Sequence, residues 1–172
     1  RSRRAATHGA GGAVTAPGAL DPDTLARLLV EQADDGLVFA DREGIIRAWS
    51  AGAERIFGFS RDDAIGQTLD LIIPERFRDA HWRGYDRVLE SGVTKYAGRL
   101  MPTRSARKDG VTIYVELSFT VIRDGASAVV GVLAGARDIT ERFTREREEQ
   151  ARLHAREEQV AGQAPSPTPP QN

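Results

Sequence analysis

The sequence predicts an α+β fold in which short helices cover one face of a five-stranded antiparallel sheet, with a further helix at each end. Three observations predict it. Two strand-like runs are followed by helical segments and then by three more strand-like runs. Asp-Gly pairs at 109–110 and 124–125 are tight-turn signals, and such short connections join antiparallel neighbours. Apolar and polar residues alternate over Val111–Ile122, as in a strand with one buried face.

The first part of the predicted fold is a capped helix followed by a hairpin. Asp21 is a typical N-cap residue, and Pro22 suits the first helical position. Strands are expected at 37–40 and 45–49, because the segment between them, 41–44, has hairpin composition.

Short helices come next, and their caps indicate where they begin. Ser50 is expected to cap a helix over 51–57, and Ser60 is expected to cap one over 61–65. An apolar segment, 68–73, then ends at a proline.

A longer helix and three strands complete the predicted fold. The helix is expected over about 75–90, and the strands over Tyr96–Arg107, Val111–Ile122 and Ala128–Arg137. In the middle strand the side chains expected on the buried face are Val111, Ile113, Val115, Leu117, Phe119 and Val121.

Composition excludes several classes of function. The 24 Lys and Arg residues nearly balance the 25 Asp and Glu residues, so we expect neither nucleic acid nor an anionic membrane as partner. No apolar run is long enough to cross a bilayer, and no signal-peptide stretch follows the basic first residues. We therefore expect a cytoplasmic protein. The absence of cysteine excludes disulfides, thiolate metal sites and a light sensor that forms a flavin–cysteine adduct.

Five local strings, in this order, resemble those of a PAS (S-box) domain. They are Gly36–Ile46, Ala53–Ser60, Ile65–Gln67, Arg107–Gly110 and Arg137–Arg142. The likeness covers about residues 25–142. One departure is Ser50, where the family often has asparagine, and either residue caps a helix.

The resemblance implies a division of the chain and a sensory function. We expect a disordered leader (1–20), an N-terminal flanking helix (21–35), the PAS domain (36–138), a C-terminal signalling helix (139–160) and a disordered Pro-rich tail (161–172). The family's fold implies a ligand or cofactor cavity between the sheet and the long helix, with the signal leaving through the C-terminal helix. The alternative is a ligand-free interaction or dimerisation module. No nucleophile–base pair has a recognisable spacing, so we expect no catalytic residues and no enzyme.

One histidine of the long helix is the candidate for chemistry. Phe77, His81, Tyr85 and Val88 share one helical stripe, while charged residues take the other side, so His81 is predicted to face the interior. A buried imidazole nitrogen without a partner costs about 1–3 kcal/mol. Its partner is either a backbone carbonyl or carboxylate of an ordinary core, or the iron of a haem.

A closer resemblance implies haem b as the cofactor. The segment from Pro74 to His81 resembles the one that carries the haem-ligating histidine in the PAS domains of direct oxygen-sensor phosphodiesterases. Those domains place a Met or Arg on the third strand, and here Arg99 and Met101 occupy that neighbourhood. The resemblance implies His81 as iron ligand, Arg99 as donor to a bound diatomic or a propionate, and Met101 as weak sixth ligand. Tyr85 completes the cofactor-binding set.

Simpler interpretations stay open at the same residues. Arg99 is also typical of a surface charge, and Met101 of core filler. Oxygen-sensing kinases of the nodule-bacterium type carry their histidine nearer Val93, where this chain has none.

The C-terminal helix leaves two alternatives for partners. Its heptad positions are Phe143, Glu146, Gln150, Leu153, Glu157 and Val160, and half of them are polar. The helix is therefore either a homodimer stalk, acting together with the PAS surface, or a solvated helix that packs only when it docks. We expect any output domain to lie on another polypeptide or in sequence beyond this chain.

Overall fold

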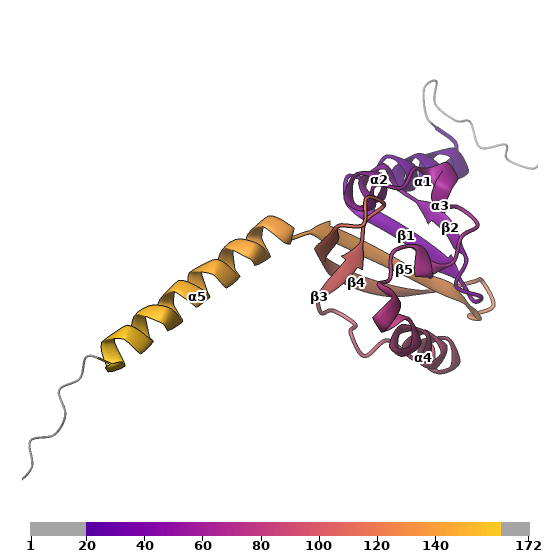
Figure 1. Cartoon of the computed structure of the whole chain (residues 1–172). Helices are drawn as coiled ribbons and strands as arrows, with labels where there is room; N and C mark the ends of the chain where they lie inside the picture. Colours follow the sequence, from indigo (N-terminus) through magenta and orange to yellow (C-terminus); the bar gives the residue numbers. More distant parts are fainter. Residues whose placement is uncertain (1–19, 163–172) are drawn as a thin grey trace, which may run out of the picture.

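The computed structural model describes residues 20–162 of the chain (Figure 1). The helices are α1 (Pro22–Glu31), α2 (Ala51–Phe57), α3 (Arg61–Ala64), the 3₁₀ helix η1 (Leu69–Leu71), α4 (Glu75–Ser91) and α5 (Thr140–Gly162). The strands are β1 (Gly36–Asp41), β2 (Ile46–Trp49), β3 (Met101–Ala106), β4 (Thr112–Arg123) and β5 (Val129–Asp138).

The strands form one five-stranded sheet in the order β2-β1-β5-β4-β3, and every neighbouring pair is antiparallel. The first and last strands of the chain's sequence order, β1 and β5, pair at the centre, from Gly36↔Ala136 to Asp41↔Gly131. The predicted fold class is confirmed. The long-range β1–β5 pairing makes the sheet continuous, because it joins the N-terminal hairpin (β1 and β2) to the three C-terminal strands.

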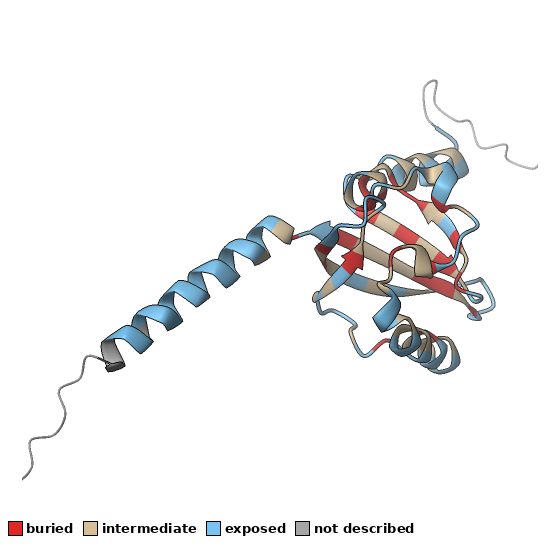
Figure 2. Ribbon diagram, viewed as in Figure 1, coloured by how far each residue is buried: buried red, intermediate tan, exposed pale blue. Residues whose placement is uncertain are grey.

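One face of the sheet, called the inner face below, carries the core. Cross-strand partners lie on the same face, so the pairs Val38↔Ala134, Leu117↔Ala136 and Met101↔Leu117 extend this face from β1 to β3. α2 packs against β1 and β5, and α3 packs against β2. The largest fully buried side chains are Trp49, Phe57, Ile46, Val115 and Ser50. Figure 2 shows the buried residues gathered in the sheet and the segments beside it.

The helix starts predicted from the caps are confirmed. Asp21 accepts a hydrogen bond from the Thr24 amide at 2.9 Å, and Ser60 accepts one from the Asp63 amide at 3.2 Å. Ser50 accepts from the Ala53 amide at 3.1 Å, and it has a further structural role. Its hydroxyl also donates to the Asp35 carbonyl at 2.8 Å and accepts from the Leu37 amide at 2.9 Å, so one buried side chain joins α2 to the start of β1.

The third strand begins five residues later than predicted, at Met101 rather than Tyr96. The Ala97 amide donates to the Thr94 carbonyl and the Arg99 amide to the Tyr96 carbonyl, which are turn hydrogen bonds. Gly98 lies between them with a φ of 69°, a left-handed conformation that interrupts an extended run. The prediction that Arg99 lies on a strand is therefore wrong.

The middle strand buries less than its alternation predicts. Ile113 and Val115 are buried, but Leu117, Phe119 and Val121 are only half-buried, because the helices cover the inner face unevenly. Val111 precedes β4 and is 49% exposed.

The two end helices differ in how they meet the body. α1 lies against β2, whereas α5 projects away from the sheet and runs to Gly162, into the segment predicted as tail (Figure 1). The expected leader, apart from residue 20, and residues 163–172 of the expected tail lie outside the described residues. Within 20–162 no helix is long and apolar enough to cross a membrane.

Candidate functional site

α4 is fixed to the sheet by the hydroxyl of Tyr85, the one buried residue of this helix. The hydroxyl donates to the carbonyl oxygens of Asp41 at 2.6 Å and Ala40 at 3.0 Å, at the end of β1. Burial raises the pKa of Tyr85 above its usual value, and the nearby Asp41 carboxylate acts in the same direction. Tyr85 is therefore a neutral hydrogen-bond donor that positions α4. Its hydroxyl proton is shared between the two β1 carbonyl oxygens.

Trp82 makes a second attachment of α4. Its indole nitrogen donates to the Asp70 carboxylate at 2.9 Å, which links α4 to η1. The indole ring lies directly over Gly44 in the β1–β2 turn, where an added Cβ would come within 2.3 Å of the ring. Gly44 also has a φ of 75°. The turn thus needs glycine both for its backbone conformation and for the close approach of Trp82.

Polar contacts hold both ends of α4. The Arg78 guanidinium donates to the Ile73 carbonyl at 3.2 Å and to the Asp70 carbonyl at 3.0 Å. At the other end, Arg123 donates to the Gly92 carbonyl at 2.9 Å. Since Tyr85 is the only buried residue of α4, these hydrogen bonds determine much of the helix position.

His81 faces the interior, as predicted, and its ring is flanked by two aromatic rings of the same helix. The ring centroids lie 5.1 Å from Trp82, edge-on, and 5.9 Å from Tyr85, stacked. Within the part of the chain that the structure describes, His81 Nδ1 is the one buried side-chain nitrogen or oxygen without a hydrogen-bond partner. The carbonyl or carboxylate expected in an ordinary core is thus absent at this atom.

Burial also sets the charge of this imidazole. Desolvation lowers the pKa of His81, and the Asp70 carboxylate opposes this shift. His81 is therefore neutral at pH 7, which is the protonation state in which imidazole binds a metal. Among residues 20–162 no group of three or more histidines and carboxylates is placed to hold a bare metal ion. His81 fits a prosthetic group whose iron needs one protein ligand.

The other two predicted cofactor-binding residues lie in different surroundings. Met101 is half-buried at the start of β3 and shares the inner face with its partner Leu117. Arg99 is exposed in the loop that precedes β3, and its backbone amide bonds the Tyr96 carbonyl. Only Met101 therefore lies on the face of the sheet against which α4 packs.

Two residues of this region have roles that the sequence analysis missed. Asp70 interrupts an apolar segment, and that interruption was the available signal. Its carboxylate accepts a hydrogen bond from Trp82 and forms an ion pair with Arg78 at 3.8 Å. Tyr96 reaches back from the loop before β3 to Phe119 on the inner face of β4, with ring centroids 6.1 Å apart. Phe119, Leu117 and Met101 form a stretch of the inner face that is apolar and incompletely covered; we call it the apolar stretch.

A five-stranded antiparallel sheet with short helices and one long helix over its inner face is the architecture of a class of sensory domains. The sequence profile described as "PAS fold" matches residues 24–139. The chain belongs to the PAS family.

Curated relatives agree with this assignment. The sensor protein FixL of Bradyrhizobium diazoefficiens is 29% identical over 119 residues, which are 69% of this chain and 23% of that protein. The oxygen sensor protein DosP of Escherichia coli is 28% identical over 109 residues, 63% of this chain and 13% of that protein. An uncharacterised protein of Azorhizobium caulinodans is 32% identical over 122 residues, 70% of this chain and 16% of that protein. The chain thus spans less than a quarter of the length of each of these relatives.

Solved structures share the fold. The PAS domain of a protein from Colwellia psychrerythraea has a TM-score of 0.60 at 24% identity, over 70% of this chain and 99% of that one. An RNA-binding light-oxygen-voltage receptor has a TM-score of 0.60 at 24% identity, over 87% of this chain and 41% of that one. At this level of identity the likeness extends to the fold alone.

Proposed function

We propose that this chain is the sensory module of a signalling protein, and that it binds a small ligand between α4 and the apolar stretch of the inner face. The observation that carries the proposal is the neutral, half-buried His81 imidazole, whose Nδ1 atom is buried and has no hydrogen-bond partner. A polar atom left unpaired inside a protein costs about 1–3 kcal/mol, and such atoms are uncommon in native structures. The resemblance to sensor proteins supports the same function.

The ligand that suits this site best is haem b, with His81 as the iron ligand. Haem combines an iron that takes one axial imidazole with a large apolar ring, and the apolar stretch supplies a matching surface. Bound there, haem would supply an iron centre able to bind a diatomic gas or to change oxidation state. Met101 lies on the same inner face and is the second residue that would hold the iron. Arg99, being in an exposed loop, suits a propionate at the rim.

The chain's own residues prepare this ligand site. Tyr85 and Trp82 hold α4 through hydrogen bonds to Asp41 and Asp70, and this fixes the direction of the His81 ring between them. Burial keeps the imidazole neutral, so that no proton has to be removed before it can bind iron.

The signal is proposed to leave through α5, whose output partner is a separate polypeptide or sequence beyond this chain. Binding can shift the protein between two arrangements only by the difference in its affinity for them. In a homodimer formed through the PAS surface and α5, such a shift would change how the two α5 helices pack.

A ligand-free interaction module is the second candidate, and α1 favours it. This helix has no buried residue, and it leaves Leu25 44% exposed and Leu29 64% exposed on one side. Exposed apolar side chains at helical spacing are typical of a surface that packs against another protein.

Titration of the purified chain with hemin separates the two candidates. We expect a Soret band that saturates at one haem per chain in the parent and in His154→Ala, a matched control on α5, and that is lost in His81→Ala. A parent protein that takes up no hemin, but dimerises through α1, would leave only the interaction module. Equal uptake by the parent and His81→Ala would exclude His81 as the ligand.

A further inference from the structure

One edge of the sheet carries cations without acids. Residues 91–108, which run from the end of α4 to the β3–β4 turn, contain five Lys or Arg and no Asp or Glu. Within 20–162 no longer stretch is free of acids. β3, the strand at this edge, lies inside the stretch. The whole chain has a formal charge of −1, so positive charge is concentrated at this edge.

Three of these five cations have no acidic partner. Arg107 pairs with Asp109, and Lys108 pairs with Asp63. In the part of the chain that the structure describes, no carboxylate bonds the exposed side chains of Lys95, Arg99 and Arg104. Arginines of α1, α2 and α3, by contrast, are paired with carboxylates. Like charges gathered without partners repel one another, and a bound acid would relieve that repulsion.

Two of the three free cations lie over tyrosine rings. Lys95 Nζ is 4.8 Å from the ring centre of Tyr96, and the central guanidinium carbon of Arg104 is 5.7 Å from that of Tyr114. Each ring also packs on a phenylalanine, with ring centroids 6.1 and 4.0 Å apart. Single-stranded nucleic acid is held by bases that stack on open aromatic faces. Because both tyrosine rings already have contacts of their own, this edge suits a different kind of anion.

Exposed apolar side chains stand among the cations. Leu100, next to Arg99, is 59% exposed, and Val93 in the same loop is 66% exposed. A phosphate backbone gains nothing from such side chains, whereas a polypeptide can bury them against an apolar residue of its own. Cations around an apolar centre therefore favour a protein segment in which Asp or Glu residues flank leucine or a similar residue.

The backbone of β3 limits how that segment can bind. Pro102 has no amide hydrogen, and the Ala106 amide already donates to the Ile72 carbonyl at 2.9 Å. A strand added to this edge would lack these two hydrogen bonds, and such features keep edge strands from pairing with other chains. Recognition at this edge therefore depends on side chains.

We propose that Lys95, Arg99 and Arg104, together with Val93 and Leu100, form a docking surface, called the basic edge, for an acidic segment of a partner protein. Carboxylates of the partner pair with the three cations, and an apolar side chain of the partner covers Leu100. This inference goes beyond the proposed function and does not depend on it. Arg99 is the one residue shared with the proposed haem site, so binding to the basic edge is measured without hemin.

Fluorescence anisotropy with the full chain tests the basic edge. The probe is a fluorescein-labelled peptide, Glu-Glu-Leu-Asp-Glu-Leu-Glu-Glu, and the same peptide with glutamine in place of every acid is the uncharged comparison. We expect saturable binding of the acidic peptide alone. Its affinity should be about ten-fold weaker in 300 mM NaCl than in 50 mM NaCl, because salt screens exposed charge pairs.

Substitutions in the basic edge should weaken binding of the acidic peptide. Lys95→Gln combined with Arg104→Gln should raise the Kd about ten-fold, because each exposed ion pair lost corresponds to about a three-fold change. Leu100→Ala should raise it about five-fold through lost apolar burial. All three side chains are exposed, so the urea midpoint of each variant should equal that of the parent.

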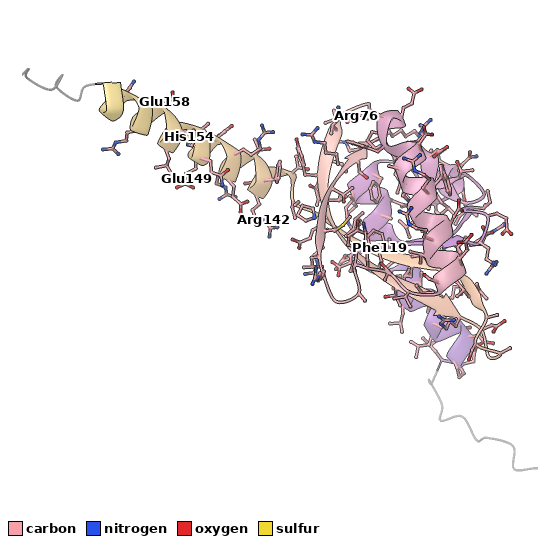
Figure 3. The ribbon with its side chains drawn as sticks, turned by 90° about the horizontal axis from the view of Figure 1, so that it is seen from below. Arg76, Phe119, Arg142, Glu149, His154 and Glu158 are labelled. Atoms are coloured by element: carbon pink, nitrogen blue, oxygen red, sulfur yellow. The ribbon has the colours of Figure 1, made fainter. Side chains whose placement is uncertain are left out.

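Arg147→Gln combined with Arg152→Gln is the matched control, since it removes the same charge elsewhere. Both positions lie on α5, where Figure 3 shows Glu149 and His154 standing clear of the body. This variant should keep the Kd of the parent to within about two-fold.

Absence of saturable binding of the acidic peptide by the parent would overturn the basic edge, and so would an equal loss of affinity in the α5 control. Tighter binding of a fluorescein-labelled strand of eight thymidines than of the peptide would identify a nucleic-acid surface and overturn it too. None of these results bears on hemin uptake, which is measured separately.

Discussion

Replacing Tyr85 with phenylalanine removes one hydroxyl group and leaves the ring that packs on the core. The hydroxyl donates to two backbone carbonyls at the end of β1, at 2.6 and 3.0 Å, and Ala40 is 1% exposed. Water cannot easily replace a donor at that depth. A buried acceptor that loses its donor costs about 1–3 kcal/mol, and we take about 1.5 kcal/mol because two carbonyls share one proton.

Urea denaturation measures this loss. With a slope of about 2 kcal/mol per M for a domain of this size, the midpoint should fall by about 0.7 M, and the ratio of folded to unfolded protein about tenfold. Tyr114→Phe is the matched control, because the hydroxyl of Tyr114 has no hydrogen-bond partner among the described residues; its midpoint should move by less than about 0.2 M.

The hydroxyl also holds α4, so the same substitution should loosen the site. Trp82 is on this helix, and its indole emission should move to longer wavelength as its contact with Asp70 weakens. If Tyr85→Phe unfolded at the same urea concentration as the parent, with the same emission, the hydroxyl would not be what attaches α4 to β1.

Three further predictions concern charge and backbone. Burial lowers the pKa of His81 in the folded chain, so near and below pH 6.5 the unfolded chain binds more protons than the folded chain does. The free energy of unfolding should therefore fall as the pH drops below about 6.5. His81→Gln should remove this dependence when urea titrations at pH 5 and pH 7 are compared. The Lys108 ammonium holds the pKa of Asp63 at about 2, and Lys108→Met should return it toward 3.8 in a carboxyl-carbon NMR titration. Gly44→Ala should lower the thermal midpoint more than Gly110→Ala, since both have positive φ but only Gly44 faces an indole ring.

Local signals account for the part of the fold that the sequence predicted well. Ser60 caps α3 through a bond to a residue three positions away, and short-range preferences of this kind are visible in sequence. The turn over Lys108–Gly110 likewise depends on Asp-Gly chemistry, with Gly110 at a φ of 81°. The alternation of apolar and polar residues predicted the strands that form the sheet.

Arg99 shows where a strand boundary escaped prediction. The run from Tyr96 onward contains enough strand-forming residues to read as extended, but Gly98 adopts a left-handed conformation and two turn hydrogen bonds form around it. This segment could form either a strand or a turn, and the contact of Tyr96 with Phe119 favours the turn. That contact joins residues far apart in sequence, so no local pattern reports it.

The sequence predicted which way His81 faces, but it did not predict the contacts around the site. The helical stripe correctly turned His81 inward, because helix periodicity determines which side faces the core. The pairing of Asp70 with Trp82 depends on how η1 lies against α4, and the pairing of Tyr114 with Phe143 joins β4 to α5. Such contacts arise from tertiary packing, and the residue types alone do not specify them.

Imidazole rescue asks whether the His81 ring is the group that binds the haem iron. His81→Gly leaves a space where the ring was, and free imidazole can enter it. We expect that this variant, loaded with hemin, lacks the parent's visible spectrum and regains it when imidazole is added, while His154→Gly keeps the parent's spectrum throughout. A His81→Gly protein that binds hemin with the parent's spectrum before any imidazole is added would exclude His81 as the iron ligand.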